Sequence, residues 1–170
     1  PGGHHVTLLA ASDEGYRNLC RLSTEAMTEA GHVSGAGGTE RTVPRERLWE
    51  AGDGLIVLSG CRRGLIPSLL AAGRDEEAKQ AAVDFRKRFG AGNFYIELQH
   101  HGVAGHDDVN RRLVRLADEI GIGVVATNNV HYLTRDDAAA HDALLALGAG
   151  AKLVDANRPR FPSAEYFMKS

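Results

Sequence analysis

The sequence has few cysteines, no long apolar run and almost no net charge. Its two cysteines, Cys20 and Cys61, are too few for a disulfide framework, so we expect a reducing, cytoplasmic setting. No apolar stretch approaches the length of a membrane span and no signal-peptide pattern opens the chain, so we expect no membrane partner. The formal net charge of −2 provides no overall attraction for nucleic acid, although one basic face or a neighbouring domain could provide it.

The composition that remains is that of an ordinary globular domain. The 170 residues are 43% hydrophobic and 25% charged, and a chain of this length can form one hydrophobic core without disulfide bonds. The chain begins with Pro1-Gly2-Gly3 and enters an apolar run almost at once. From this start we expect a piece of a longer polypeptide.

Short apolar runs alternate with amphipathic segments along most of the chain. The runs 6–10, 55–59, 94–98 and 122–127 are typical of buried strands. Helical patterns cover 44–51, 65–72, 75–89, 107–120 and 136–147, and Gly90 and Gly121 end two of them. This alternation predicts an α/β fold with mainly parallel strands. Since four strands are too few to close a parallel barrel, the sheet is either open or part of a barrel.

The first helical segment and the stretch after it carry two further predictions. Ser12 or Asp13 caps a helix whose apolar spacing of three and four predicts one buried face, with Cys20 as a small buried hydrophobe. That face contains Tyr16, Leu19, Cys20, Ser23, Met27 and Ala30. The glycine-rich stretch 31–42 lacks the Lys-Ser/Thr ending of a phosphate loop, and we interpret it as a mobile linker.

Polar side chains follow three of the predicted strands where each strand ends. The segments are Gly60-Cys61, Gln99-His100-His101 and Asn128-Asn129-Val130-His131, and His4-His5 precedes the first strand. The carboxyl ends of parallel strands are where α/β folds place their chemistry. Any one of these histidines could be a plain loop residue, but Cys, His and carboxylate groups at several strand ends are typical of a zinc or mixed-metal site. We therefore predict that Cys61 and His131 lie near each other.

Several sequence motifs match one known family in the order that the family has them. They are His5-Val6-Thr7-Leu8-Leu9-Ala10, Glu14-Gly15-Tyr16-Arg17-Asn18-Leu19, Gly54-Leu55-Ile56-Val57-Leu58-Ser59-Gly60-Cys61, Phe94-Tyr95-Ile96-Glu97-Leu98-Gln99, Val125-Ala126-Thr127-Asn128-Asn129-Val130-His131-Tyr132, Asp137-Ala138 with His141-Asp142, and Asn157-Arg158 with Tyr166-Phe167-Met168-Lys169-Ser170. Nearly the whole chain thereby resembles the PHP (polymerase and histidinol phosphatase) domain of bacterial C-family DNA polymerases.

The resemblance implies a fold and a metal site. The fold would be part of a distorted (β/α)7 barrel, and the complete domain would hold divalent metal, namely zinc, manganese or magnesium. The family's ligand positions fall on His5, Cys61, Asn129 and His131, and its other ligands lie before Pro1. The family usually has Asp where this chain has Asn129. Because an amide offers a neutral oxygen in place of a charged, bridging carboxylate, metal binding should be weaker here.

The resemblance also implies a parent protein. Residues 1–147 would be the C-terminal portion of a PHP domain, and 148–170 a connection toward the polymerase core. The parent would be a DNA-templated DNA polymerase that uses primer-template DNA, deoxynucleotides and core magnesium, with replisome or translesion subunits as partners. No catalytic residue falls in this chain, because the polymerase carboxylates lie outside it. Asn128-Asn129, with the segments 15–22 and 59–64, resembles the error-prone branch more than the replicative one.

Two other functions stay open from the sequence. One is a free-standing PHP phosphoesterase that uses metal-activated water. The other is a structural module without metal that binds a proofreading partner. Asn129 and the matching carboxyl-terminal segment argue against the phosphoesterase.

Overall fold

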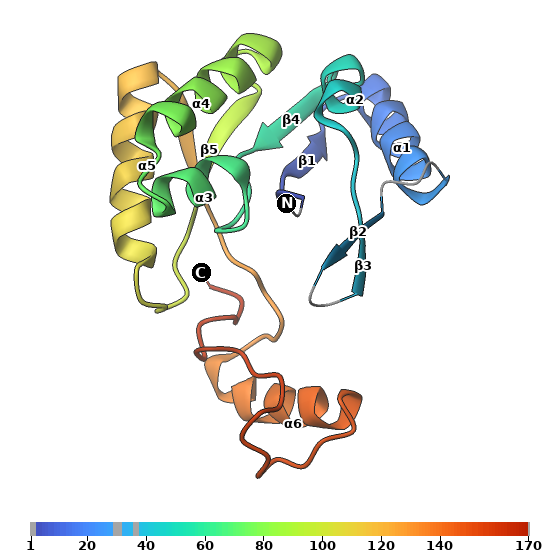
Figure 1. Ribbon diagram of the computed structural model, residues 1–170, viewed down its shortest axis with the longest axis vertical. Coiled ribbons are helices and arrows are strands. Elements are labelled where there is room, and N and C mark those ends of the chain that lie inside the picture. Colours follow the sequence, from blue (N-terminus) through green and yellow to red (C-terminus); the bar gives the residue numbers. More distant parts are fainter. Residues whose placement is uncertain (1–2, 29–31, 36–37, 170) are drawn as a thin grey trace.

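The computed structural model describes residues 3–28, 32–35 and 38–169, without the side chains of 32–40. Its main sheet contains β1 (Thr7–Ala10), β4 (Leu55–Leu58), β5 (Phe94–Gln99) and β6 (Gly123–Thr127) in the order β1-β4-β5-β6. β4, β5 and β6 are parallel, and β1 runs antiparallel beside β4 (Figure 1). The predicted α/β fold with mainly parallel strands is confirmed, and the sheet is consistent with a partial (β/α) barrel.

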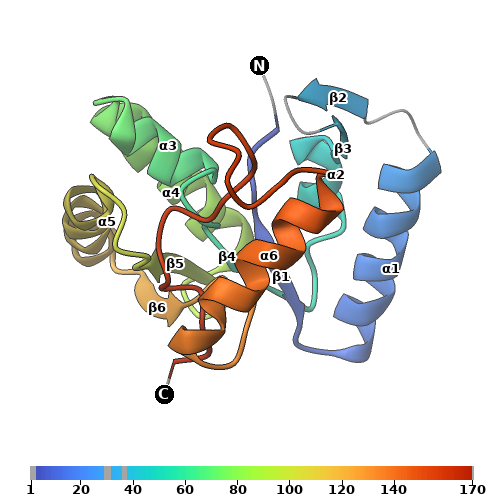
Figure 2. The ribbon, with the colours of Figure 1, turned by 90° about the horizontal axis from the view of Figure 1, so that it is seen from below.

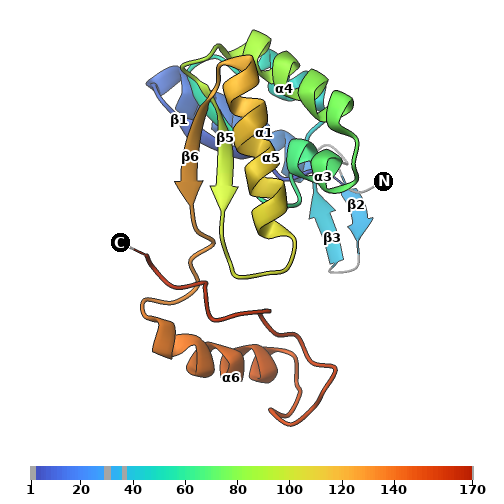
Figure 3. The same cartoon turned by 90° about the vertical axis from the view of Figure 1, so that its left-hand side faces the viewer.

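One face of the sheet is covered by three helices. These are α3 (Leu65–Ala71), α4 (Asp75–Phe89) and α5 (His106–Ile120), which lie together against the parallel strands (Figure 3). The strand side chains of this layer are fully buried, as Val57, Phe94 and Ile96 show. α4 and α5 end at Gly90 and Gly121, where φ is +82° and +63°. Both helix ends predicted from glycine are thereby confirmed.

Helix α1 (Asp13–Thr28) is present, but most of the face predicted to be buried is exposed; of its members, Leu19 packs partly buried against the core. Tyr16 and Met27 are 64% and 58% exposed, and Cys20 is exposed as well. The helix instead packs through Gly15 and Leu22, and a Cβ on Gly15 would lie 1.9 Å from the Gly54 carbonyl oxygen. α1 lies beside β1 at the edge of the sheet and is in contact with it (Figures 1 and 2). Ala30, also assigned to that face, lies outside the described residues.

The glycine-rich stretch is not a plain linker where the structure describes it. It forms an antiparallel hairpin of β2 (His32–Gly35) and β3 (Gly38–Arg41), followed by the short helix α2 (Arg45–Glu50). Alternation of side chains over four residues is too short a signal to predict such strands among so many glycines.

The carboxyl-terminal part stands below the ends of the parallel strands. A short 3-10 helix, η1 (Arg135–Asp137), leads into α6 (Ala138–Gly148), and residues 149–169 return beside the loop that follows β6 (Figures 2 and 3). Tyr132 bridges to Phe167, and the nearly inaccessible side chain of Arg158 pairs with Asp142. No helix among the described residues is long and apolar enough to cross a membrane.

Candidate metal centre

The topology of β1 and β4 brings His5 and Cys61 together. Since β1 is antiparallel to β4, the residues before β1 lie at the end of the sheet where β4 finishes. The His5 backbone N–H donates to the Arg63 carbonyl at 3.1 Å, which holds the segment against the turn after β4. That approach needs Gly60, whose φ is +81° and whose added Cβ would lie 2.3 Å from the His5 carbonyl oxygen. As a result, Nδ1 of His5 lies 3.3 Å from Sγ of Cys61.

This pair lines an open cavity of about 890 Å³ together with Asn129. Its wall is formed by Gly3, His4, His5, Val6, Thr7, Leu8, Leu22, Arg41, Thr42, Val43, Leu48, Cys61, Arg63, Glu97, Gln99 and Asn129. Three of the four predicted ligand positions, His5, Cys61 and Asn129, therefore line the same cavity. The fourth, His131, is absent from this wall.

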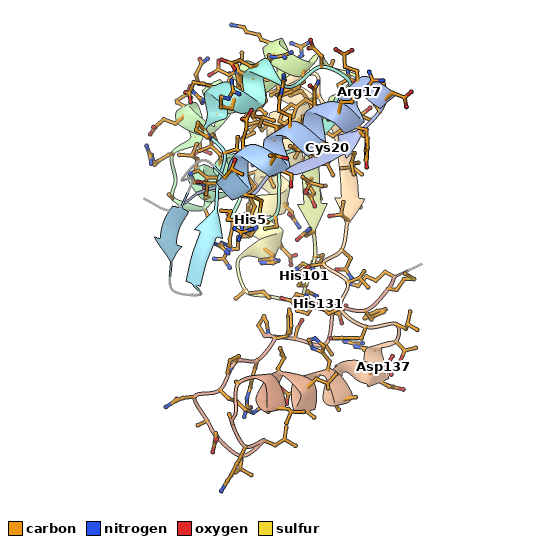
Figure 4. The ribbon with its side chains drawn as sticks, turned by 90° about the vertical axis from the view of Figure 1, so that its right-hand side faces the viewer. His5, Arg17, Cys20, His101, His131 and Asp137 are labelled. Atoms are coloured by element: carbon orange, nitrogen blue, oxygen red, sulfur yellow. The ribbon has the colours of Figure 1, made fainter. Side chains whose placement is uncertain are left out.

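His131 lies at the same end of the sheet as Cys61 but in different surroundings. Its Nδ1–H donates to the Asn129 carbonyl at 2.9 Å, and its backbone N–H donates to the Tyr166 carbonyl at 2.8 Å. The ring packs against Phe161 and His141, with centroids 4.5 and 5.5 Å away. Figure 4 shows His131 beside His101, below the strands, with His5 closer to the sheet. That Cys61 and His131 come close enough to share an ion stays a prediction.

The loop that carries Asn129 is held by three partly buried hydrogen bonds. His101 is 4% exposed and stacked on Tyr166 with ring centroids 4.4 Å apart, and its Nε2 accepts the backbone N–H of Asn129 at 3.3 Å. Burial lowers the pKa of His101, which favours the neutral ring that this bond requires. Asn128 donates its amide to the carbonyls of Glu165 and Phe167 at 3.2 and 2.6 Å. Asn128 therefore anchors the carboxyl-terminal segment, while Asn129 faces the cavity.

The donors at this site fit zinc in kind and spacing. Zinc–nitrogen and zinc–sulfur bonds of about 2.1 and 2.3 Å place tetrahedral ligands about 3.6 Å apart. The observed separation of 3.3 Å between His5 and Cys61 is close to that value. However, no three His, Cys, Asp or Glu side chains among residues 3–28, 32–35 and 38–169 are grouped to hold an ion. His5 and Cys61 are thus two donor side chains in contact, fewer than the four ligands of a zinc site, and the predicted metal site stays a prediction.

Sequence reasoning missed Glu97 as a member of this cavity. Glu97 is 5% exposed, in the middle of β5, and its carboxylate accepts hydrogen bonds from Thr7, Gln99 and Thr127. One signal was available: a single acid within the otherwise apolar run Phe94–Leu98. Because a charged side chain is rarely buried without polar partners, a single acid in a buried strand indicates a polar cavity beside that strand.

Comparison with known proteins gives one family and a consistent set of relatives. The model of the family described as the PHP domain matches residues 2–101. The DNA polymerase III subunit alpha of Deinococcus radiodurans is 40% identical over 169 residues, 99% of this chain and 12% of that protein. The subunits of the same name from Borreliella burgdorferi and Thermus aquaticus are each 38% identical, over 98% and 99% of this chain. The chain spans 14% and 13% of their lengths.

Proposed function

This chain belongs to the PHP domain family, and we propose that it is the accessory metal-binding domain of a DNA-templated DNA polymerase of the alpha-subunit type. The observation that supports this is the 38–40% identity to three DNA polymerase III alpha subunits over almost every residue. Polymerization of deoxynucleotides on primer-template DNA would depend on carboxylates and magnesium outside these residues. Replisome or translesion subunits would be the partners of the whole protein.

Within that protein, this domain would bind a divalent ion such as zinc or manganese through His5 and Cys61. Asn129 would contribute one neutral oxygen, and His131 would join if its ring turned from Phe161 toward the cavity. A bound ion of this kind supplies a Lewis acid or an activated water. The chain's own residues would orient these donors. For the parent polymerase we favour the error-prone branch of the family, because the Asn128-Asn129 pair resembles that branch.

Primer extension tests the polymerase proposal. The natural full-length protein is expected to extend a primed DNA template with deoxynucleotides and magnesium. His5→Ala and Cys61→Ala should leave extension within about twofold, because these residues would serve the accessory domain and not the polymerase site. Absence of extension by the folded wild-type protein would contradict the proposal.

A second candidate, a PHP phosphoesterase, is favoured by one feature of the cavity. Arg41 and Arg63 line the same cavity as His5 and Cys61, so two cationic side chains share it with the donors. Such a wall suits a phosphate ester. Hydrolysis of a generic aryl phosphate that Cys61→Ala abolishes, without primer extension, would replace the polymerase proposal with this one.

A further inference from the structure

A second cavity, separate from the candidate metal centre, lies between α6 and the segment that returns beside it. Its volume is about 320 Å³, which is within the range of small-molecule sites. Tyr132, His141 and Asp142 line it from the loop and the helix, and Arg160 and Phe161 line it from the returning segment. None of these five residues lines the cavity of the candidate metal centre. The metal prediction therefore gives this second cavity no role.

Three aromatic rings gather at this cavity. The rings of Tyr132 and Phe161 lie with their centroids 5.3 and 5.1 Å from that of His141, and all three residues line the same space. Much of the remaining wall is small and apolar, with the alanines at positions 138, 139 and 164. Aromatic rings pack well against other flat rings, in offset stacks or edge to face. This wall therefore suits a ligand that contains a flat ring.

The cavity also carries a cation that no acid neutralises among the described side chains. Asp142 is the single acid among its described lining residues, and both oxygens of that carboxylate accept hydrogen bonds from the buried guanidinium of Arg158. Arg160 belongs to none of the ion pairs found between described residues. Its Nη2 donates to two backbone carbonyls at 3.3 and 3.5 Å. An anion that enters the cavity can therefore pair with Arg160, which is exposed to solvent.

We infer that this cavity binds a small planar organic anion, namely an aromatic ring that carries a phosphate or a carboxylate. The oxyanion pairs with Arg160, and the ring packs against Tyr132 and Phe161. A guanidinium suits either oxyanion, because its planar fork donates two parallel hydrogen bonds. A ring nitrogen of His141 can donate one more. The inference goes beyond the proposed polymerase role and does not depend on it.

Binding of phenyl phosphate and of benzoate to the natural full-length protein tests this inference, measured by saturation-transfer difference NMR. We expect binding of one or both, and the tighter of the two identifies the oxyanion. Arg160→Gln removes the charge of an exposed side chain and should weaken binding about 10-fold or more. Arg17→Gln is the matched control, because Arg17 is also exposed and belongs to no ion pair between described residues. Figure 4 shows Arg17 on α1, at the opposite end of the molecule from α6.

Cyclohexyl phosphate tests the contribution of the ring, since it keeps the oxyanion and lacks the aromatic face. The inference is overturned if neither aromatic compound binds the wild type, or if Arg160→Gln stays within about twofold of Arg17→Gln. Equal affinity for cyclohexyl and phenyl phosphate also overturns it, because the aromatic wall would then not contribute. If Arg63→Gln, in the larger cavity, abolishes binding while Arg160→Gln does not, the anion binds there and the inference is wrong.

Discussion

Gly60 decides whether His5 can reach Cys61, and Gly60→Ala tests that contact. Its φ of +81° is unfavourable for alanine, and the new Cβ would lie 2.3 Å from the His5 carbonyl oxygen. Because that neighbour is backbone, it cannot rotate away, and the segment before β1 must shift. Gly73→Ala is the matched control: its φ is +74° and nothing lies within 4 Å of its added Cβ.

The magnitude follows from the difference between the two glycines. Both substitutions cost roughly 1–2 kcal/mol for a left-handed alanine. Gly60→Ala should cost about 0.5–1.5 kcal/mol more, because the His5 N–H to Arg63 carbonyl bond is lost. That extra free energy corresponds to roughly 2- to 12-fold faster local opening. We also expect Co²⁺ affinity to fall about 10-fold or more in Gly60→Ala and to stay within about twofold in Gly73→Ala.

Hydrogen exchange read by mass spectrometry on the full-length protein measures local opening, and cobalt titration measures the site. Each variant is followed in the peptides that cover its own substitution. The reasoning is refuted if Gly60→Ala exchanges no faster than Gly73→Ala relative to wild type and binds Co²⁺ as wild type does. In that case the close approach of Gly60 to His5 would not hold the metal donors in place.

Two further predictions follow from the same structure. Asn129→Asp in the full-length protein adds a carboxylate to the cavity and should raise its zinc occupancy. Inductively coupled plasma mass spectrometry measures the occupancy, and no change would mean that position 129 does not contribute to zinc binding. The 170 residues on their own should self-associate, because Leu9 and Val124 on the outer strands are 48% and 47% exposed. A monodisperse monomer in light scattering, together with one sharp transition in a thermal melt, would contradict this.

The sequence by itself determined the α/β alternation and much of the candidate site. Buried strands are short apolar runs, and a helix often ends at a glycine because the backbone there adopts a positive φ. Both features depend on local sequence and can be predicted without knowing the fold. The polar residues at strand ends were also readable, because parallel strands finish at one edge of a sheet. Cys61 was found in this way, whereas His5 was assigned through the resemblance to the PHP family, and the structure places the two side chains in contact.

Only the tertiary structure decided which surfaces are covered. Helix α1 has an apolar stripe, but it packs through Leu22 and through Gly15, which lies against the Gly54 carbonyl, and a pattern of large apolar residues cannot predict a glycine contact. The opposite directions of β1 and β4 place His5 beside Cys61, and no local pattern encodes strand direction. Glu97 and Asn128 have their roles through partners about 30 to 90 residues away in the chain. Such contacts depend on how distant segments pack, and this is the physical reason that composition and periodicity could not predict them.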